Sequence, residues 1–173
     1  IKTNGQIGLK IFNPDGSEAE RSGNGIRIFA RYLWDTGYQK DKSFQLQTKG
    51  GLVSVAILDE RGEMIKVAMG TATFESRLIP VNGPPRQVIY EAININGEEY
   101  RVTCLSIGNP HCVMPMAVIS KDSALRLGPA IENHQLFPNR INMQLLKVID
   151  RNNIQIEIWE RGAGYTLASG SSS

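Results

Sequence analysis

The feature that most constrains this chain is a pair of serine-containing turns, each placed where a helix is expected to begin. Ser22 lies in the run Arg-Ser-Gly-Asn-Gly and Ser169 in the run Ala-Ser-Gly-Ser-Ser, and each follows a Glu-Arg pair, at 20–21 and at 160–161. A helix N-terminus exposes unpaired backbone N–H groups and carries a partial positive charge. Two such ends directed at one point would bind an anion, with one serine on each side of it. The sequence therefore predicts an anion site that needs both turns.

Composition and charge exclude several classes of protein. The 173 residues are 41% hydrophobic, as in an ordinary globular protein, and no apolar run approaches the roughly 18 residues of a membrane helix. Lys and Arg are scattered and the net charge is +2, which gives no electrostatic footprint for nucleic acid. The two cysteines do not make a disulfide framework, which favours a reducing, cytoplasmic compartment. The two histidines lack paired ligand spacing, so no metal site is predicted.

The first half predicts one amphipathic helix among short strands. From residue 23 to about 36 the apolar side chains recur at intervals of three and four, as on one face of a helix. Ser22 fits the N-cap of this helix, and Gly37 fits the position just after its end. Alternating and apolar runs predict strands at 7–13, 44–48, 52–58 and 64–69, with a turn at Asn-Pro-Asp-Gly, 13–16.

The second half repeats this order. Asn96 and Gly97 form a strong hairpin signal between two apolar runs, and a short helix is expected from residue 122, continuing past Pro129. A strand, a glycine-containing loop, a serine and an expected helix occur in both halves, which suggests an internal duplication. The strands predicted here are 87–95, 98–106 and 154–160.

The boundary between the halves is expected near residue 80. Residues 78–85 are rich in proline and glycine, which is typical of a connection between domains. We predict an N-terminal domain over 1–80 and a C-terminal domain over 81–173, both partial. The chain starts at Ile1 and stops where the helix after Ser169 should begin, so we expect it to be the central portion of a longer protein, truncated at both ends.

Each candidate site residue also has a purely structural interpretation. Ser22 would serve only as a helix cap, and Ser169 would lie in a flexible Ser/Gly run. At 108–112, Gly-Asn-Pro-His-Cys is either a tight turn or a Cys-His nucleophile, although adjacent side chains on a strand point to opposite faces. Glu160 and Arg161 form either an exposed pair or a clamp for the ammonium and carboxylate groups of an amino acid.

Four motifs together resemble one family, the diaminopimelate epimerases, which are cofactor-independent amino-acid epimerases of lysine and cell-wall synthesis. The resemblance covers nearly the whole chain, from residue 11 to residue 171, and the motifs follow the family's order. They are Asn-x-Asp-Gly-Ser-Glu from Asn13, Ser-Gly-Asn-Gly-x-Arg from Ser22, Gly-Asn-Pro-His-Cys from Gly108, and Glu-Arg-Gly-x-Gly from Glu160.

The resemblance implies an α+β fold of two similar domains, each a β-barrel-like sheet around a central helix, with the active site in the cleft between them. It implies interconversion of LL- and meso-diaminopimelate without a cofactor, a small-molecule amino-acid substrate and a homodimer, with neither nucleic acid nor membrane as partner. Ser22 and Ser169 take the two catalytic acid/base positions, and His111 matches a histidine near the site. The substrate contacts carry over onto Asn13, Gly23, Asn24, Asn109, Asn142, Glu160, Arg161, Gly170 and Ser171.

The catalytic positions depart from the family's pattern. Both are cysteine in the family and serine here, Tyr165 stands where glutamate is common, and Ser172 stands where glycine is usual. In the family one thiolate removes the α-proton while the opposite thiol delivers a proton to the other face. A serine hydroxyl rarely ionises without a neighbouring base, whereas a thiol at a helix N-terminus ionises near neutral pH. Cys112 matches a non-catalytic family cysteine and does not replace the missing thiols.

Three interpretations of the serines follow. The protein is a diaminopimelate epimerase whose cysteines were replaced, by engineering or in an inactive lineage; a natural serine-bearing relative that acts on another amino acid; or a non-enzymatic amino-acid-binding protein. The further departures at Tyr165 and Ser172 favour the natural relative over a pair of point substitutions. The number of matching motifs disfavours an unrelated β-rich module.

Overall fold

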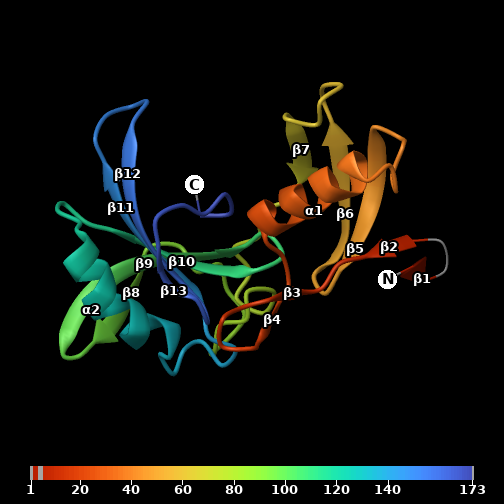
Figure 1. The fold of residues 1–173 in the computed structure, drawn as a ribbon. Coiled ribbons are helices and arrows are strands. Elements are labelled where there is room, and N and C mark those ends of the chain that lie inside the picture. Colours follow the sequence, from red (N-terminus) through yellow and green to blue (C-terminus); the bar gives the residue numbers. More distant parts are fainter. Residues whose placement is uncertain (1, 4–5, 173) are drawn as a thin grey trace. The chain divides into compact units, whose positions relative to one another are not determined.

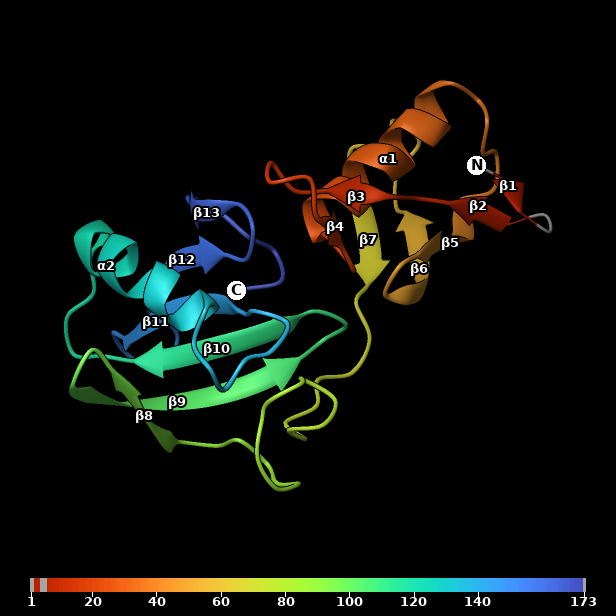
Figure 2. The same cartoon turned by 90° about the horizontal axis from the view of Figure 1, so that it is seen from below.

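The chain divides into two units between Thr71 and Ala72 in the computed structural model, which describes residues 2–3 and 6–172. Each unit packs one helix against a β-sheet (Figures 1 and 2), which confirms an α+β fold of two similar parts. The division falls earlier than the boundary expected at residue 80. The reason is that Ile79 and Val81, in the segment expected to be the connection, are buried in the core of the second unit.

The first unit is a five-stranded sheet in the order β1-β2-β5-β6-β7, antiparallel except where β2 runs parallel to β5. Strand β6 alternates between buried valines and exposed side chains, so only one face of the sheet is covered. A separate two-stranded ribbon, β3–β4, carries the turn predicted at 13–16. The strands are β1 Lys2–Thr3, β2 Gln6–Gly8, β3 Ile11–Phe12, β4 Glu18–Ala19, β5 Ser43–Thr48, β6 Gly51–Ile57 and β7 Ile65–Ala68.

Helix α1, Gly23–Asp35, forms where the apolar spacing predicts it. Ser22 caps its start, since Ser22 Oγ accepts a hydrogen bond from the Gly25 N–H group at 3.1 Å. Gly37 follows its end with a φ of 65°, a left-handed conformation that glycine adopts without strain. The helix buries its apolar stripe in the core of this unit, which consists of Ile7, Ile26, Ala30, Leu33, Leu46, Val53 and Val55.

The single strand predicted at 7–13 is two strands with different partners. Ile7 pairs with Leu46 of β5, and Ile11 pairs with Ala19 of β4. The alternating apolar side chains pack against one core, but the strands that carry them pair with different partners. No local signal in the sequence marks the break at residues 9–10.

The second unit is a six-stranded sheet in the order β13-β12-β11-β10-β9-β8. The predicted hairpin is confirmed, with Asn96 and Gly97 both at positive φ between β8 and β9. Strand β8 begins later than expected, at Glu91. The one parallel pair, β10–β11, is joined through helix α2, Lys121–Glu132. The strands are β8 Glu91–Ile95, β9 Glu98–Ser106, β10 Pro110–Pro115, β11 Asn142–Val148, β12 Ile154–Glu160 and β13 Gly164–Thr166.

Helix α2 lies on the six-stranded sheet (Figure 2) and continues past Pro129, as expected. It approaches strand β12 closely at Gly128, where an added Cβ would lie 2.4 Å from the Trp159 ring. Only glycine fits there, so this contact fixes the distance between α2 and β12. Leu127 and Ile131 of the helix are completely buried in the core of the unit.

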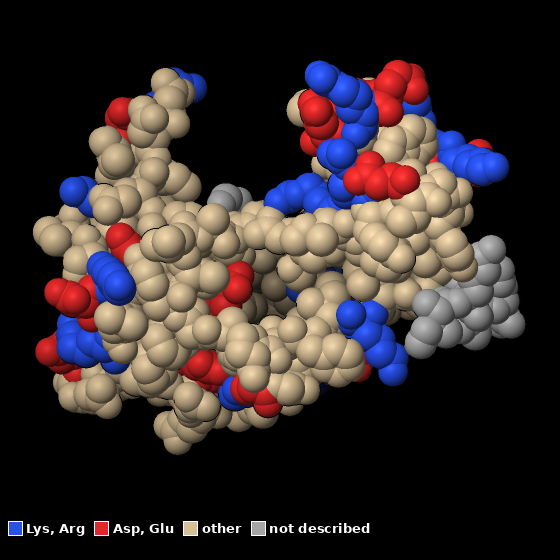
Figure 3. Space-filling view, in the orientation of Figure 1, with Lys and Arg blue, Asp and Glu red and all other residues tan. Residues whose placement is uncertain are grey.

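On the face shown in Figure 3, Lys and Arg are interspersed with Asp and Glu. Neither described helix is long and apolar enough to cross a membrane.

Candidate active site

Ser22 in the first unit is held on both sides. The chain before it is fixed by Arg21, whose guanidinium donates to the Met69 carbonyl oxygen at 2.5 Å and to the Gly50 carbonyl oxygen at 2.7 Å. The Gly50 N–H group donates in return to the Glu20 carbonyl oxygen at 2.9 Å. A Cβ on Gly50 would lie 2.9 Å from Arg21 Cγ, so the approach requires a glycine. The turn is thereby anchored to the β5–β6 hairpin and to the end of β7.

The other predicted residues of this unit lie close to the start of α1. Gly23 is buried as the first helical residue, and Asn24 is exposed, with its Oδ1 accepting from Arg27. The Ile11 side chain lies 3.8 Å from the position of a Cβ on Gly25, which places the β3–β4 ribbon beside this end of the helix. Asn13 holds the ribbon's turn, where its amide donates to Ser17 Oγ at 3.1 Å.

Ser169 in the second unit is buried, at 6% exposure, in a turn made of hydroxyl groups. Ser172 Oγ donates to Ser169 Oγ at 3.0 Å, and Ser171 Oγ lies 3.3 Å from the same atom. The Ser172 N–H group donates to the Ser169 carbonyl oxygen at 3.1 Å, which closes one turn. Gly170 is exposed in this turn. The helix predicted after Ser169 is described only as far as this turn, because the described residues end at 172.

The hydroxyl turn is joined to the sheet through Gln144, a residue that the sequence analysis missed. Its Nε2 group lies 3.0 Å from Ser172 Oγ and 3.1 Å from His111 Nδ1. His111 is 2% exposed, and burial, with a smaller contribution from the charge of Arg161, lowers its pKa from 6.5 to about 4. The imidazole is therefore neutral at pH 7. The one available signal for Gln144 is its position two residues after Asn142, on the same face of β11.

Asn142 ties two loops together. Its Nδ2 donates to the Pro110 carbonyl oxygen at 2.7 Å, and its Oδ1 accepts from the Arg161 N–H group at 3.0 Å. The side chain is 8% exposed, and it holds the loop of Asn109 and the loop of Glu160 and Arg161 in register. Asn109 is also 8% exposed, and its Oδ1 has no hydrogen-bond partner among the described residues.

Glu132, the last residue of α2, is a second side chain that the sequence did not reveal. Its carboxylate accepts from the Gly162 N–H group at 2.9 Å and from Trp159 Nε1 at 2.6 Å, and it pairs with Arg140 at 3.0 Å. The side chain of Glu132 is 8% exposed. It therefore fixes the loop that follows β12, and with it the backbone of Arg161.

Cys112 belongs to the core and not to the site. It pairs across the strands with Cys104, and both are completely buried. A hydrogen bond with Cys104, together with burial, raises the pKa of the Cys112 thiol, so it is a poor nucleophile. The Tyr165 side chain is also bonded to a residue outside the predicted site. Its hydroxyl donates to Glu157 Oε2 at 2.7 Å, and this bond raises the pKa of Tyr165.

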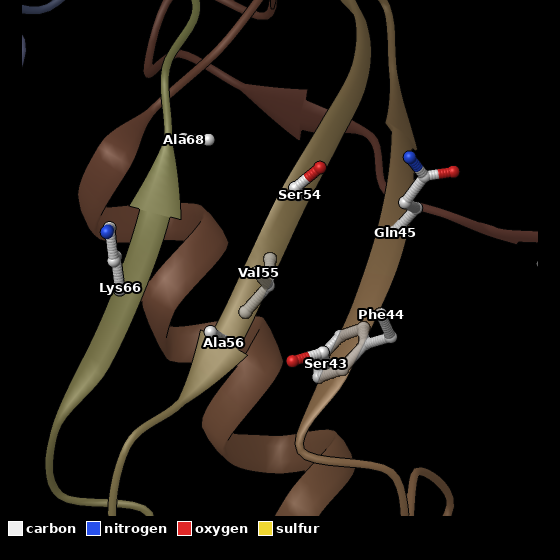
Figure 4. Close-up of a pocket in the computed structure, with 8 residues that line it drawn as sticks. All are labelled: Ser43, Phe44, Gln45, Ser54, Val55, Ala56, Lys66 and Ala68. Carbon is white, nitrogen blue, oxygen red and sulfur yellow. The ribbon is translucent and has the colours of Figure 1, made fainter.

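None of the predicted site residues lines the depressions described in the first unit. Figure 4 shows one on the open face of the sheet, on the side opposite α1, and none of the predicted site residues lines it. Its lining side chains are Ser43, Phe44, Gln45, Ser54, Val55, Ala56, Lys66 and Ala68. Within the described part of the chain, no three His, Cys, Asp or Glu side chains form a group that could hold a metal ion.

The predicted residues thus form one group in each unit. Those of the first unit surround the start of α1. Those of the second unit lie at the ends of β10, β11 and β12 and in the hydroxyl turn, where they are linked by the hydrogen bonds of Asn142 and Gln144.

The fold is shared with solved structures of amino-acid racemases and epimerases. A probable proline racemase from Agrobacterium radiobacter matches with a TM-score of 0.68 at 15% identity, over 95% of this chain and 53% of that one. A hydroxyproline epimerase from Agrobacterium vitis matches with a TM-score of 0.63 at 14% identity, over 91% of this chain and 50% of that one. At these identities the likeness concerns the fold alone.

The sequence comparisons identify the family. The family model described as Diaminopimelate epimerase matches residues 1–75 and 103–173, and the chain belongs to this family. It is 55% identical to Diaminopimelate epimerase 2 of Nostoc sp., over 99% of this chain and 60% of that protein. It is 41% identical to the diaminopimelate epimerase of Moorella thermoacetica, over 95% of this chain and 60% of that protein. The chain thus spans about 60% of the length of these relatives.

Proposed function

We propose that the whole protein is a cofactor-independent amino-acid epimerase of lysine biosynthesis, which interconverts LL- and meso-diaminopimelate in the cytoplasm. The observation that carries the proposal is the 55% identity to Diaminopimelate epimerase 2 of Nostoc sp. over nearly the whole chain. The four motifs that carry the family's substrate contacts are present in order. The homodimer stays a prediction.

In this proposal Ser22 and Ser169 occupy the two acid/base positions. Ser22 lies at the N-terminus of α1, where unpaired backbone N–H groups and the helix dipole favour a carboxylate. Arg161 and Glu160 would meet the charged groups of the amino acid, with the Arg161 backbone fixed by Asn142. The developing negative charge of the deprotonated substrate would be stabilised by the same donors.

A second candidate is an amino-acid-binding protein that does not turn its ligand over. The observation that favours it is the bond of Ser22 Oγ to the Gly25 N–H group, a donor that cannot take up the hydroxyl proton. Without a base, a serine hydroxyl remains protonated at neutral pH and removes an α-proton slowly. Binding would then persist while exchange of the α-proton is lost.

The test is exchange of the α-proton of diaminopimelate stereoisomers in deuterated water, followed by NMR on the whole protein. The native form is compared with a Ser22→Cys, Ser169→Cys double variant. A matched control is Ser54→Cys, Ser123→Cys, which adds one thiol to each unit outside the motifs. Each form is also titrated with diaminopimelate by calorimetry.

Exchange in the native form supports the epimerase and shows that the hydroxyls suffice. Exchange in the double variant alone, with binding in both forms, supports the binding protein built on an epimerase site. Absence of both exchange and binding in every form overturns diaminopimelate as the ligand and leaves an isomerase of a different amino acid.

A further inference from the structure

The hydrogen bonds that run from Gln144 through Ser172 to Ser169 form a chain with a single direction. Gln144 Nε2 carries two protons, one directed at His111 Nδ1 and the other at Ser172 Oγ. Since Ser172 Oγ accepts this bond, its own proton is directed at Ser169 Oγ, 3.0 Å away. Ser169 Oγ therefore accepts a hydrogen bond from this chain of donors.

The direction of the chain is set by the Gln144 amide nitrogen, which donates both of its bonds. Because Nε2 of the Gln144 amide can only donate, Nδ1 of the neutral His111 imidazole accepts this hydrogen bond. The same nitrogen lies 3.0 Å from Ser172 Oγ, to which it donates. An amide nitrogen takes up no proton, so His111 orients Gln144 and does not act as the base for Ser169.

We propose that Ser172 and Gln144 are positioning residues that hold Ser169 Oγ as an acceptor and stabilise negative charge on it. A hydrogen bond donated to the charged form of a group favours that form. The role in turnover rests on the proposed epimerase function, whereas the effect on charge at position 169 does not.

In the protonation step, the O–H bond of Ser169 breaks and a C–H bond forms at the substrate α-carbon. The electron pair of the O–H bond stays on Oγ, and the substrate carbanion is neutralised. The Ser172 hydroxyl then donates to an anionic oxygen, which strengthens the bond. In the reverse step the same contact stabilises Oγ before it removes the proton. Glycine, the residue usual in the family at position 172, has no hydroxyl to make this contact.

The test uses a thiol as a reporter of charge at position 169. In a Ser169→Cys variant the thiol pKa is measured from the pH dependence of alkylation by iodoacetamide. Cys104 and Cys112 are completely buried, and the unsubstituted chain gives their background. Adding Ser172→Ala is expected to raise this pKa by about one unit, a tenfold loss of thiolate at neutral pH. Adding Gln144→Leu to Ser169→Cys is expected to raise the thiol pKa by a smaller amount. Adding Ser172→Thr, which keeps a hydroxyl group, is expected to leave the thiol pKa as in Ser169→Cys alone.

The matched control is Ser171→Ala, since Ser171 also contacts Ser169 Oγ but is not bonded to Gln144 in the chain described. A smaller pKa change than with Ser172→Ala supports the proposal. An unchanged pKa with Ser172→Ala, or an equal change with Ser171→Ala, overturns it. Near-ultraviolet circular dichroism reports the fold of each variant, and Ser172→Gly serves in place of Ser172→Ala if that variant unfolds. Because the readout needs no substrate, a protein that fails to exchange diaminopimelate still gives a decisive result.

Discussion

The two serine turns share a Ser-Gly pair, but the structure holds them by different means. Ser22 bonds to the backbone of its own helix, three residues ahead, whereas Ser169 is bonded to Ser172 and through Gln144 to the middle of the sheet. The first contact is local and follows from helix capping. The second needs a strand more than twenty residues away, so it exists only once the unit has folded. The conformation of two similar turns can therefore depend on tertiary structure to very different extents.

The Glu-Arg pairs before the two serines differ in the same way. In the first unit the Arg21 side chain makes the anchor, through two backbone carbonyl groups. In the second unit the backbone of Arg161 is anchored by Asn142, and its side chain donates to the Asn139 carbonyl oxygen at 3.1 Å on the surface. The first arginine is therefore anchored through its side chain to two carbonyl groups, whereas the second is also anchored through its backbone N–H group.

The largest loss in the free energy of unfolding is expected from Glu132→Leu, in the second unit. The change leaves the Trp159 and Gly162 N–H groups and Arg140 without their shared acceptor. Removing one partner of a buried ionic network costs about 3–5 kcal/mol. This loss of stability is measured by urea unfolding followed through Trp159 fluorescence, in a Trp34→Phe background. The control Glu157→Leu should cost far less, and equal losses would contradict the role given to Glu132.

The next effect is a pH dependence confined to the second unit, which contains both histidines. The folded pKa of His111, about 4, lies below its ordinary value of 6.5, so between these values the unfolded chain binds more protons. The free energy of unfolding should therefore fall by about 3 kcal/mol from pH 7 to pH 4. The slope is read from urea unfolding through Trp159.

The slope should disappear in His111→Asn and persist in His134→Asn. Unfolding followed through Trp34 fluorescence reports on the first unit. Between pH 7 and pH 5 its free energy of unfolding should lack the pH dependence caused by His111. A slope retained in His111→Asn would show that other groups are responsible.

A smaller effect is expected from Arg21→Met, which removes the anchor of the first turn. Two charge-assisted hydrogen bonds to carbonyl groups are lost, at a cost of about 2–3 kcal/mol in the free energy of unfolding. The measurement is urea unfolding through Trp34 fluorescence. Arg27→Met is the matched control, because Arg27 is exposed and bonds only to the nearby Asn24 in the contacts described. A comparable loss in both variants would remove the distinction between the two arginines.

The smallest effect is expected from Ser22→Ala, which removes the helix cap and should cost about 1 kcal/mol. Ser22→Asp keeps an acceptor for the Gly25 N–H group and should retain most of the stability. Thermal unfolding through Trp34 separates the two variants. If Ser22→Asp is as unstable as Ser22→Ala, capping is not what Ser22 supplies.

Much of the candidate site was predictable only as a set of motifs. The sequence places Asn142, Arg161 and Ser169 on the list of candidates, but it does not show that Asn142 bonds to the Arg161 backbone. Gln144 and Glu132 carry no motif at all. Their partners are 28 to 33 residues away for Gln144 and 8 to 30 residues away for Glu132, which no local pattern encodes.

The sequence by itself determined helix α1 with its cap, the β8–β9 hairpin and the order of the family motifs. Each of these depends on neighbouring residues, through apolar spacing, capping and the conformational preference of Asn-Gly. Tertiary structure alone decided the break between β2 and β3, the division at residue 71, and the bond from Gln144 to Ser172. Those features depend on which distant segment a strand or side chain meets, because burial and pairing are properties of the folded chain.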